Sequence, residues 1–144
     1  MNFKKINNLD ESSNLYEMNN HKNARKYSFN QTKFTFEDHQ KWLKKKIRSK
    51  KNNFFVFKSG NITLGHIREE EKYKKKYLSW SIMPSKKFKG YGTKMLKKFL
   101  EKKNNTYYAF VHKNNLSSKK MSLKIGFKII EIKKNFYFLR YTKS

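Results

Sequence analysis

The chain has 144 residues, of which 36 are lysine or arginine and 10 are aspartate or glutamate, so its formal charge at pH 7 is +26. This length predicts one domain over residues 1–144, and the absence of cysteine excludes disulfides and thiolate chemistry. No apolar run approaches the roughly 18 residues of a membrane span, and the first residues lack the apolar centre of a signal peptide, so we expect a cytoplasmic protein.

The positive charge raises the question of a nucleic-acid partner. Lysine outnumbers arginine 32 to 4, and the lysines are spread along the whole chain. Bidentate phosphate contacts favour the planar fork of arginine, so this pattern indicates a biased composition and a solvated basic surface. We expect no nucleic-acid partner, although the positive field would attract small anionic ligands.

The first half is predicted to hold a short strand, two helices and two strands. Thr35, with Asp38 three residues later, resembles a capping box at the start of the second helix. Aromatic and β-branched residues indicate the two strands, which a Gly-containing turn separates. In chain order the expected elements are a strand at Asn2–Ile6, helices at Asp10–Met18 and Thr35–Ile47, a strand at Asn52–Lys58, a turn at Ser59–Asn61 and a strand at Ile62–Glu69.

The second half is predicted to follow a charged loop and to begin with a strand at Lys76–Met83. Alternation places Tyr77, Ser79 and Ser81 on one face of this strand. A helix from Gly92 carries apolar residues at a 3.6-residue period. A strand at Tyr107–Val111, a short helix that ends at Gly126 and a C-terminal hairpin complete a mixed α/β domain.

Between strand and helix lies the pattern Lys87-x-x-Gly90-x-Gly92. Backbone amides at a helix N-terminus attract an anion, and glycine lets a phosphate approach the backbone. The spacing is neither that of a P-loop nor that of a dinucleotide-binding turn. Taken alone, such a pattern in a lysine-rich loop is more often an ordinary turn.

A second pattern, formed by Asn115, Ser118, Gly126 and Phe127, changes that interpretation. Together the two patterns resemble the acetyl-CoA signature of the GNAT N-acetyltransferases, and the resemblance spans essentially the whole chain. It implies the GNAT fold, a single α/β domain with a central mixed, mostly antiparallel sheet that is flanked by helices and splays in a V between its two central strands. It also implies acetyl-CoA as co-substrate, with no metal.

The resemblance implies a set of cofactor contacts. Lys87 stands where the family has Arg or Gln, and the catalytic candidate Ser122 stands where a tyrosine often protonates the leaving thiolate. Serine is a poor acid, so either another group or water protonates the thiolate, or Ser122 only orients CoA. The pantetheine arm is expected along Ile82 and Met83, the pyrophosphate on the backbone of Lys87, Phe88, Lys89, Gly90, Tyr91, Gly92 and Thr93, and further contacts at Asn115 and Ser118.

A narrower resemblance concerns the acceptor. The patterns Arg25-x-x-Ser28-x-Asn30 and His39-x-x-Trp42 are similar to those of a GNAT subgroup that acetylates nucleotide-linked amino sugars on the route to nonulosonic acids such as pseudaminic acid. This implies that the first three residues line the acceptor pocket and that the other two position the nucleotide sugar. A core tryptophan and a structurally bonded histidine explain the second pattern equally well.

The general base is left open between His66 and Glu70, and Ser79 and Ser81 are expected to contact substrate near the thioester. The leading hypothesis is acetylation of a small-molecule amine, the amino group of a nucleotide-linked sugar. The alternatives are a protein N-terminal acetyltransferase of the ribosomal-protein type and a basic nucleic-acid-binding module without the chemistry. The sequence leaves open whether the chain forms a homodimer.

Overall fold

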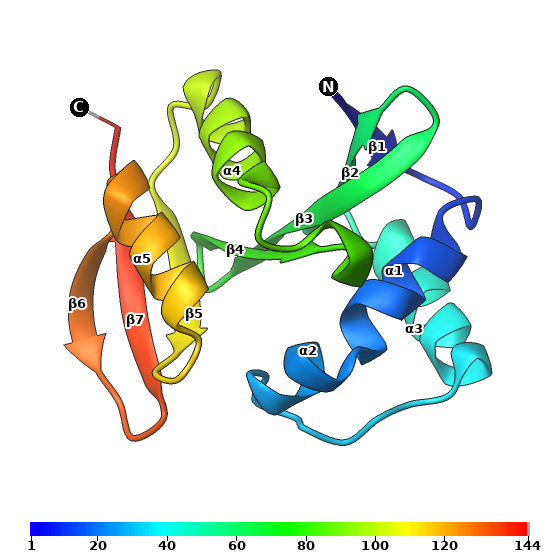
Figure 1. The fold of residues 1–144 in the computed structure, drawn as a ribbon, viewed down its shortest axis with the longest axis horizontal. Helices are drawn as coiled ribbons and strands as arrows, with labels where there is room; N and C mark the ends of the chain where they lie inside the picture. Colours follow the sequence, from blue (N-terminus) through cyan, green and yellow to red (C-terminus); the bar gives the residue numbers. More distant parts are fainter. Residues whose placement is uncertain (144) are drawn as a thin grey trace.

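The computed structural model describes residues 1–143, in which seven strands form one sheet in the order β1-β2-β3-β4-β5-β7-β6 (Figure 1). The strands are β1 (Asn2–Ile6), β2 (Asn52–Ser59), β3 (Ile62–Lys72), β4 (Lys75–Ile82), β5 (Tyr107–His112), β6 (Lys128–Ile132) and β7 (Phe136–Tyr141). The helices are α1 (Ser12–Asn20), α2 (Lys22–Lys26), α3 (Phe36–Arg48), α4 (Tyr91–Glu101) and α5 (Leu116–Ile125), with one 3-10 turn, η1 (Pro84–Lys86).

The sheet is mixed and mostly antiparallel, as expected. Every pair of neighbouring strands is antiparallel except β4 and β5, which are parallel. In the described chain these two strands are matched at Lys76 with Tyr107 and at Tyr77 with Tyr108, and beyond these pairs they diverge. Figure 1 shows β5, β6 and β7 on one side of the molecule and β1, β2 and β3 on the other, with β4 between them.

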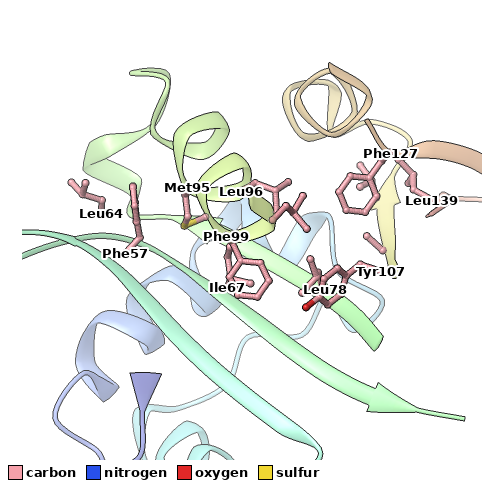
Figure 2. Packing of buried hydrophobic residues seen from close by; sticks show 13 residues of the cluster. Phe57, Leu64, Ile67, Leu78, Met95, Leu96, Phe99, Tyr107, Phe127 and Leu139 are labelled. Atoms are coloured by element: carbon pink, nitrogen blue, oxygen red, sulfur yellow. The ribbon is translucent and has the colours of Figure 1, made fainter. Parts of the chain in front are cut away.

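The two faces of the sheet are covered by different helices. The apolar stripe of α4, including Met95, Leu96 and Phe99, packs on β3 and β4 in the first hydrophobic cluster (Figure 2). Leu15 of α1 and Leu43 of α3 are buried in a second cluster with residues of β2. Each fully buried side chain of this kind contributes about 1.5–3 kcal/mol. None of the helices in residues 1–143 is long and apolar enough to cross a membrane.

The prediction of a charged loop before the fourth strand is wrong. Strand β3 continues through the acidic run to Lys72, and a turn at Tyr73 and Lys74, with φ of 51° and 63°, leads directly into β4. The strand accommodates its carboxylates because they are paired. Glu69 accepts a hydrogen bond of 2.6 Å from the Tyr107 hydroxyl, and Glu70 lies 3.2 Å from the ammonium of Lys72.

The helices near the N-terminus differ in detail from the expectation. Helix α1 begins and ends two residues later, and the five-residue helix α2 was not expected. The start of α3 is confirmed, because the Thr35 hydroxyl accepts a hydrogen bond of 3.1 Å from the amide of Asp38. Together α1, α2, the following loop and α3 form a wall opposite β4 and β5, and this wall borders the site.

Candidate active site

A cleft of about 1280 Å³ occupies the wedge between β4 and β5 and continues between the N-termini of α4 and α5 and the wall formed by α1, α2 and α3. It collects most of the residues that the sequence singled out. On the acceptor side these are Arg25, Ser28, Asn30, His39, Trp42, His66, Glu70, Ser79 and Ser81. On the cofactor side they are Ile82, Lys87, Phe88, Gly90, Tyr91, Gly92, Thr93, Asn115 and Ser118.

Three expected site residues lie outside the lining of this cleft. Met83 is buried in the second hydrophobic cluster, because its amide donates to the carbonyl of Leu64 at 2.8 Å and its side chain turns into the core. Ser122 is fully buried and donates its hydroxyl to the carbonyl of Lys119 at 3.0 Å. Lys89 is exposed beside the glycine turn. A serine at position 122 is too short to reach the cleft from there.

The backbone of β4 presents polar groups to the wedge. In an antiparallel pair, opposite residues alternate between hydrogen-bonded and non-bonded pairs. The bond between Met83 and Leu64 fixes the phase, so the amide and carbonyl groups of Trp80 and Ile82 point away from β3. These groups face the diverging edge of β5, where an extended ligand or a thioester carbonyl can take their hydrogen bonds.

The turn before α4 has the geometry that an anion cradle requires. Gly90 is the N-cap residue with φ of 79°, and within residues 1–143 no side chain caps this end of the helix. The first-turn amides are therefore available, and the helix dipole makes them attractive to an anion. Lys87 lies beside them in the cleft, where burial lowers the pKa of its ammonium group. Phe88, with φ of 63°, turns the chain at the same place. These groups fit a pyrophosphate.

The two glycines of this turn serve different purposes. A Cβ built on Gly90 meets none of the described atoms within 4 Å, so glycine is required there by its left-handed backbone. A Cβ on Gly92 would lie 3.0 Å from the sulfur of Met121, so this glycine lets α4 approach α5 closely. Helix packing, as well as access for phosphate, therefore explains the second glycine.

We expect Gly90→Ala to weaken acetyl-CoA binding roughly tenfold, because the left-handed conformation costs an L-residue about 1–2 kcal/mol and the turn would relax away from the cradle geometry. Calorimetric titration with acetyl-CoA measures the change. Gly60→Ala is the matched control, since Gly60 has φ of 58° and open space around it but lies in the β2–β3 turn. Equal losses of affinity in both variants would contradict a role for the cradle.

Two buried histidines are joined through Asn19 of α1. The Asn19 amide nitrogen lies 3.2 Å from Nε2 of His39, and its oxygen lies 3.1 Å from Nε2 of His66. Because an amide nitrogen donates and an amide oxygen accepts, His39 is unprotonated at Nε2 and His66 is protonated there. Their Nδ1 atoms are buried without a partner in the described chain. The sequence carried no signal for Asn19, since asparagine is common throughout.

Both imidazoles are neutral at pH 7. Burial and then the charge of Arg25 lower the pKa of His39 to about 4. Burial, followed by Arg68 and His39, lowers the pKa of His66 to about 3. Protonation of either ring would place a charge beside arginine in a poorly solvated site.

Glu70, the other candidate base, is held as a carboxylate. Burial acts to raise the pKa of Glu70, but Arg68, Lys46 and Lys72 outweigh it and lower that pKa. The carboxylate lies 3.2 Å from each of the two ammonium groups. Glu70 therefore serves as a counter-ion more readily than as a proton acceptor.

The Arg25 guanidinium organises the wall of the acceptor side. It donates to the carbonyls of Asn19 at 2.8 Å and Asn30 at 2.9 Å and to the hydroxyl of Ser28 at 3.2 Å. Burial lowers the pKa of this guanidinium. The three residues of the first acceptor pattern are thus brought together, and they bond to one another.

The geometry as a whole defines a site for an acyl-CoA on a mixed sheet with a central wedge. The family model described as "Acetyltransferase (GNAT) domain" matches residues 3–128, and the chain belongs to this family. It is therefore an acetyl-CoA-dependent N-acetyltransferase. Among residues 1–143, no three His, Asp or Glu side chains gather in a way that could hold a metal ion.

Solved structures share this fold. The spermidine N-acetyltransferase of Vibrio cholerae, in complex with CoA and spermine, superimposes with a TM-score of 0.80 at 16% identity, covering 96% of this chain and 92% of that one. A GNAT-family acetyltransferase of Bacillus anthracis gives 0.79 at 19%, covering 99% and 95%. The N-acetyltransferase PseH of Campylobacter jejuni gives 0.74 at 22%, covering 99% and 98%. A search of curated protein sequences finds no match.

Proposed function

We propose that the acceptor is the amino group of a nucleotide-linked amino sugar. The observation that carries this proposal is the charge of the cleft wall, which favours an anionic substrate. The basic side chains of the lining are Arg25, Arg68 and Lys72 on the acceptor side and Lys86 and Lys87 beside the glycine turn, and the acidic ones are Asp38 and Glu70.

The same charges disfavour a polyamine. A polycation needs several carboxylates free to pair with its ammonium groups, whereas Glu70 is already paired with Lys46 and Lys72, which leaves Asp38 as the acidic residue of the described lining without an ion pair. The likeness to the Vibrio cholerae spermidine acetyltransferase is a likeness of fold at 16% identity. The positive field would hold a polyamine away and draw a nucleotide in.

Flat side chains add to this support. The partly exposed rings of Phe34 and Trp42 line the cleft, and the buried ring of His39 packs against both of them with centroid distances of 5.4 Å. Across the cleft, Tyr77 stacks on Phe110 with an interplanar angle of 2° at 6.1 Å. Such faces suit a planar base and a sugar ring better than a flexible chain.

Bound acetyl-CoA supplies the acetyl thioester, and the chain's own residues position the amine. Ser81 lies opposite His66 on neighbouring strands, one residue before Ile82 at the wedge. The Nε2 of His66 is bonded to Asn19, and its Nδ1 is buried without a partner in the described chain. Because the pKa of His66 is about 3, we assign it a positioning role in the acceptor wall, and the amine proton leaves through water in the cleft. Because the Ser122 hydroxyl is bonded to Lys119, we assign Ser122 a structural role.

Acetyl-CoA-dependent thiol release by the purified protein tests the proposal. The acceptors are a UDP-linked 4-amino-dideoxy sugar, spermidine and an N-terminal peptide, each at the same concentration. We expect release with the nucleotide sugar at least tenfold above that with the other two. Release with the peptide or with spermidine in its place would assign the site to that acceptor and end the amino-sugar proposal.

A further inference from the structure

Arg68 stands in the cleft with its guanidinium uncommitted. It lies on β3 opposite Ser79 of β4, and its guanidinium carbon is 5.4 Å from the centroid of the Trp42 ring. Burial lowers the pKa of this group, against an opposing effect of Glu70. In residues 1–143 no carboxylate comes within 4.0 Å of it, and no protein group accepts a hydrogen bond from it.

Arg68 differs from Arg25 in the hydrogen bonds that its guanidinium makes. The guanidinium of Arg25 donates hydrogen bonds to three protein oxygens, whereas that of Arg68, in the same cleft, donates none to the described chain. Arg68 is partly buried, and a charge drawn partly out of water without an ion pair costs some stability. The chain holds only 4 arginines beside 32 lysines, so an arginine kept here indicates a use for the planar fork. That fork matches the two oxygens of a phosphate.

The position of Arg68 separates it from the cofactor cradle. Gly65 and Ile67 of β3 face α4, since a Cβ on Gly65 would lie 3.1 Å from the sulfur of Met95. Successive side chains of a strand point to opposite faces. Arg68 therefore lies on the face of α1 and α3, away from the helix that binds the pyrophosphate of CoA.

We propose that Arg68, backed by the ring of Trp42, is the contact for a phosphate of the acceptor. This inference rests on the proposed function and deepens it, because it identifies the chemical group by which the acceptor is recognised. The subsite takes a nucleoside diphosphate whether or not that nucleotide carries an amine.

UDP, which has no amine, is the probe, and calorimetric titration of the full chain is the measurement. We expect Arg68→Met to weaken UDP binding roughly 10- to 100-fold, the worth of a charge-assisted contact. Arg68→Lys keeps a point charge without the fork and should fall between. Affinity for acetyl-CoA should change less than twofold in both variants. Arg48→Met, at the exposed end of α3, is the matched control and should bind UDP as the native chain does.

Thermal stability gives a second readout with the opposite sign. Removing a partly buried charge that has no ion pair should leave Tm of the ligand-free Arg68→Met variant equal or higher, whereas a purely structural contact with Trp42 would lower Tm. UDP binding that is unchanged in Arg68→Met, or absent from the native chain, would overturn the subsite. If UDP depends on Arg68 but the UDP-linked amine is not acetylated, the subsite stands and the proposed function fails. If Arg68→Met acetylates the UDP-linked amine with the same KM as the native chain, the proposed function stands and the Arg68 subsite fails.

Discussion

Lowering the pH from 7 to 5 is expected to remove roughly 3 to 4 kcal/mol from the free energy of unfolding, because His39 and His66 are buried in neutral form. Their folded pKa values of about 4 and 3 lie below the ordinary histidine value of 6.5 that applies in the unfolded chain. Between these values the unfolded chain binds more protons than the folded chain, so stability falls as the pH falls through 6.5. Above pH 7 both states are neutral at these rings, and this contribution to the pH dependence vanishes.

Urea unfolding at pH 7 and pH 5 measures this loss. The range from pH 7 to pH 5 lies above the titration of Glu11 and Glu70, because their folded pKa values are lowered. The stabilisation that these two carboxylates provide is therefore lost only at lower pH. The double variant His39→Gln/His66→Gln should lose most of the pH dependence. A slope that stays equally steep in the double variant would assign the effect to other groups.

Gly65→Ala is expected to cost about 3 kcal/mol of stability and to weaken acetyl-CoA binding as well. An added Cβ would stand 2.6 Å from the backbone oxygen of Ser81 and 2.7 Å from Cδ1 of Ile82. A backbone atom cannot turn aside as a side chain can, so β3 and β4 must separate. The separation displaces Ile82, whose backbone faces the wedge.

Thermal unfolding and titration with acetyl-CoA test both parts of this expectation. Ile62→Ala is the control on the same strand, because Ile62 is 55% exposed and its truncation should change stability by less than about 0.5 kcal/mol. A Gly65→Ala variant as stable as the native chain would show that β3 and β4 tolerate more distance than the structure indicates.

The sequence predicted the elements whose signals are local. The strand at Asn52–Lys58, the capped start of α3 and the C-terminal hairpin are confirmed because periodicity and caps act over a few residues. The β3–β4 turn escaped prediction for a physical reason. Tight hairpin turns usually place Gly or Asn at positive φ, whereas Tyr73 and Lys74 occupy it here. The acidic residues before that turn also favour the prediction of a loop. Their place in a strand is explained by partners such as Tyr107, which is distant in the sequence.

The cofactor side of the site was more predictable than the acceptor side. The glycine turn before α4 is a continuous segment, and its backbone geometry follows from residue type. The acceptor wall depends on contacts across long stretches of sequence, such as the bridge from His39 through Asn19 to His66. Asn19 of α1 belongs to this wall and does not stand out in a chain that is rich in asparagine, and Arg68 of β3 gains its meaning only from its place in the cleft.

The narrow join between β4 and β5 also bears on how the molecule opens. The part formed by β5, α5, β6 and β7 is hydrogen-bonded to the rest of the sheet through two matched residue pairs. Elements with few links separate as cooperative units at less than the full cost of unfolding. A ligand seated across the wedge closes that route and adds about 2.7 kcal/mol at a hundredfold excess over Kd. We therefore expect bound substrate to slow amide exchange in these strands. As more of the cleft is occupied, the two parts of the sheet separate less often.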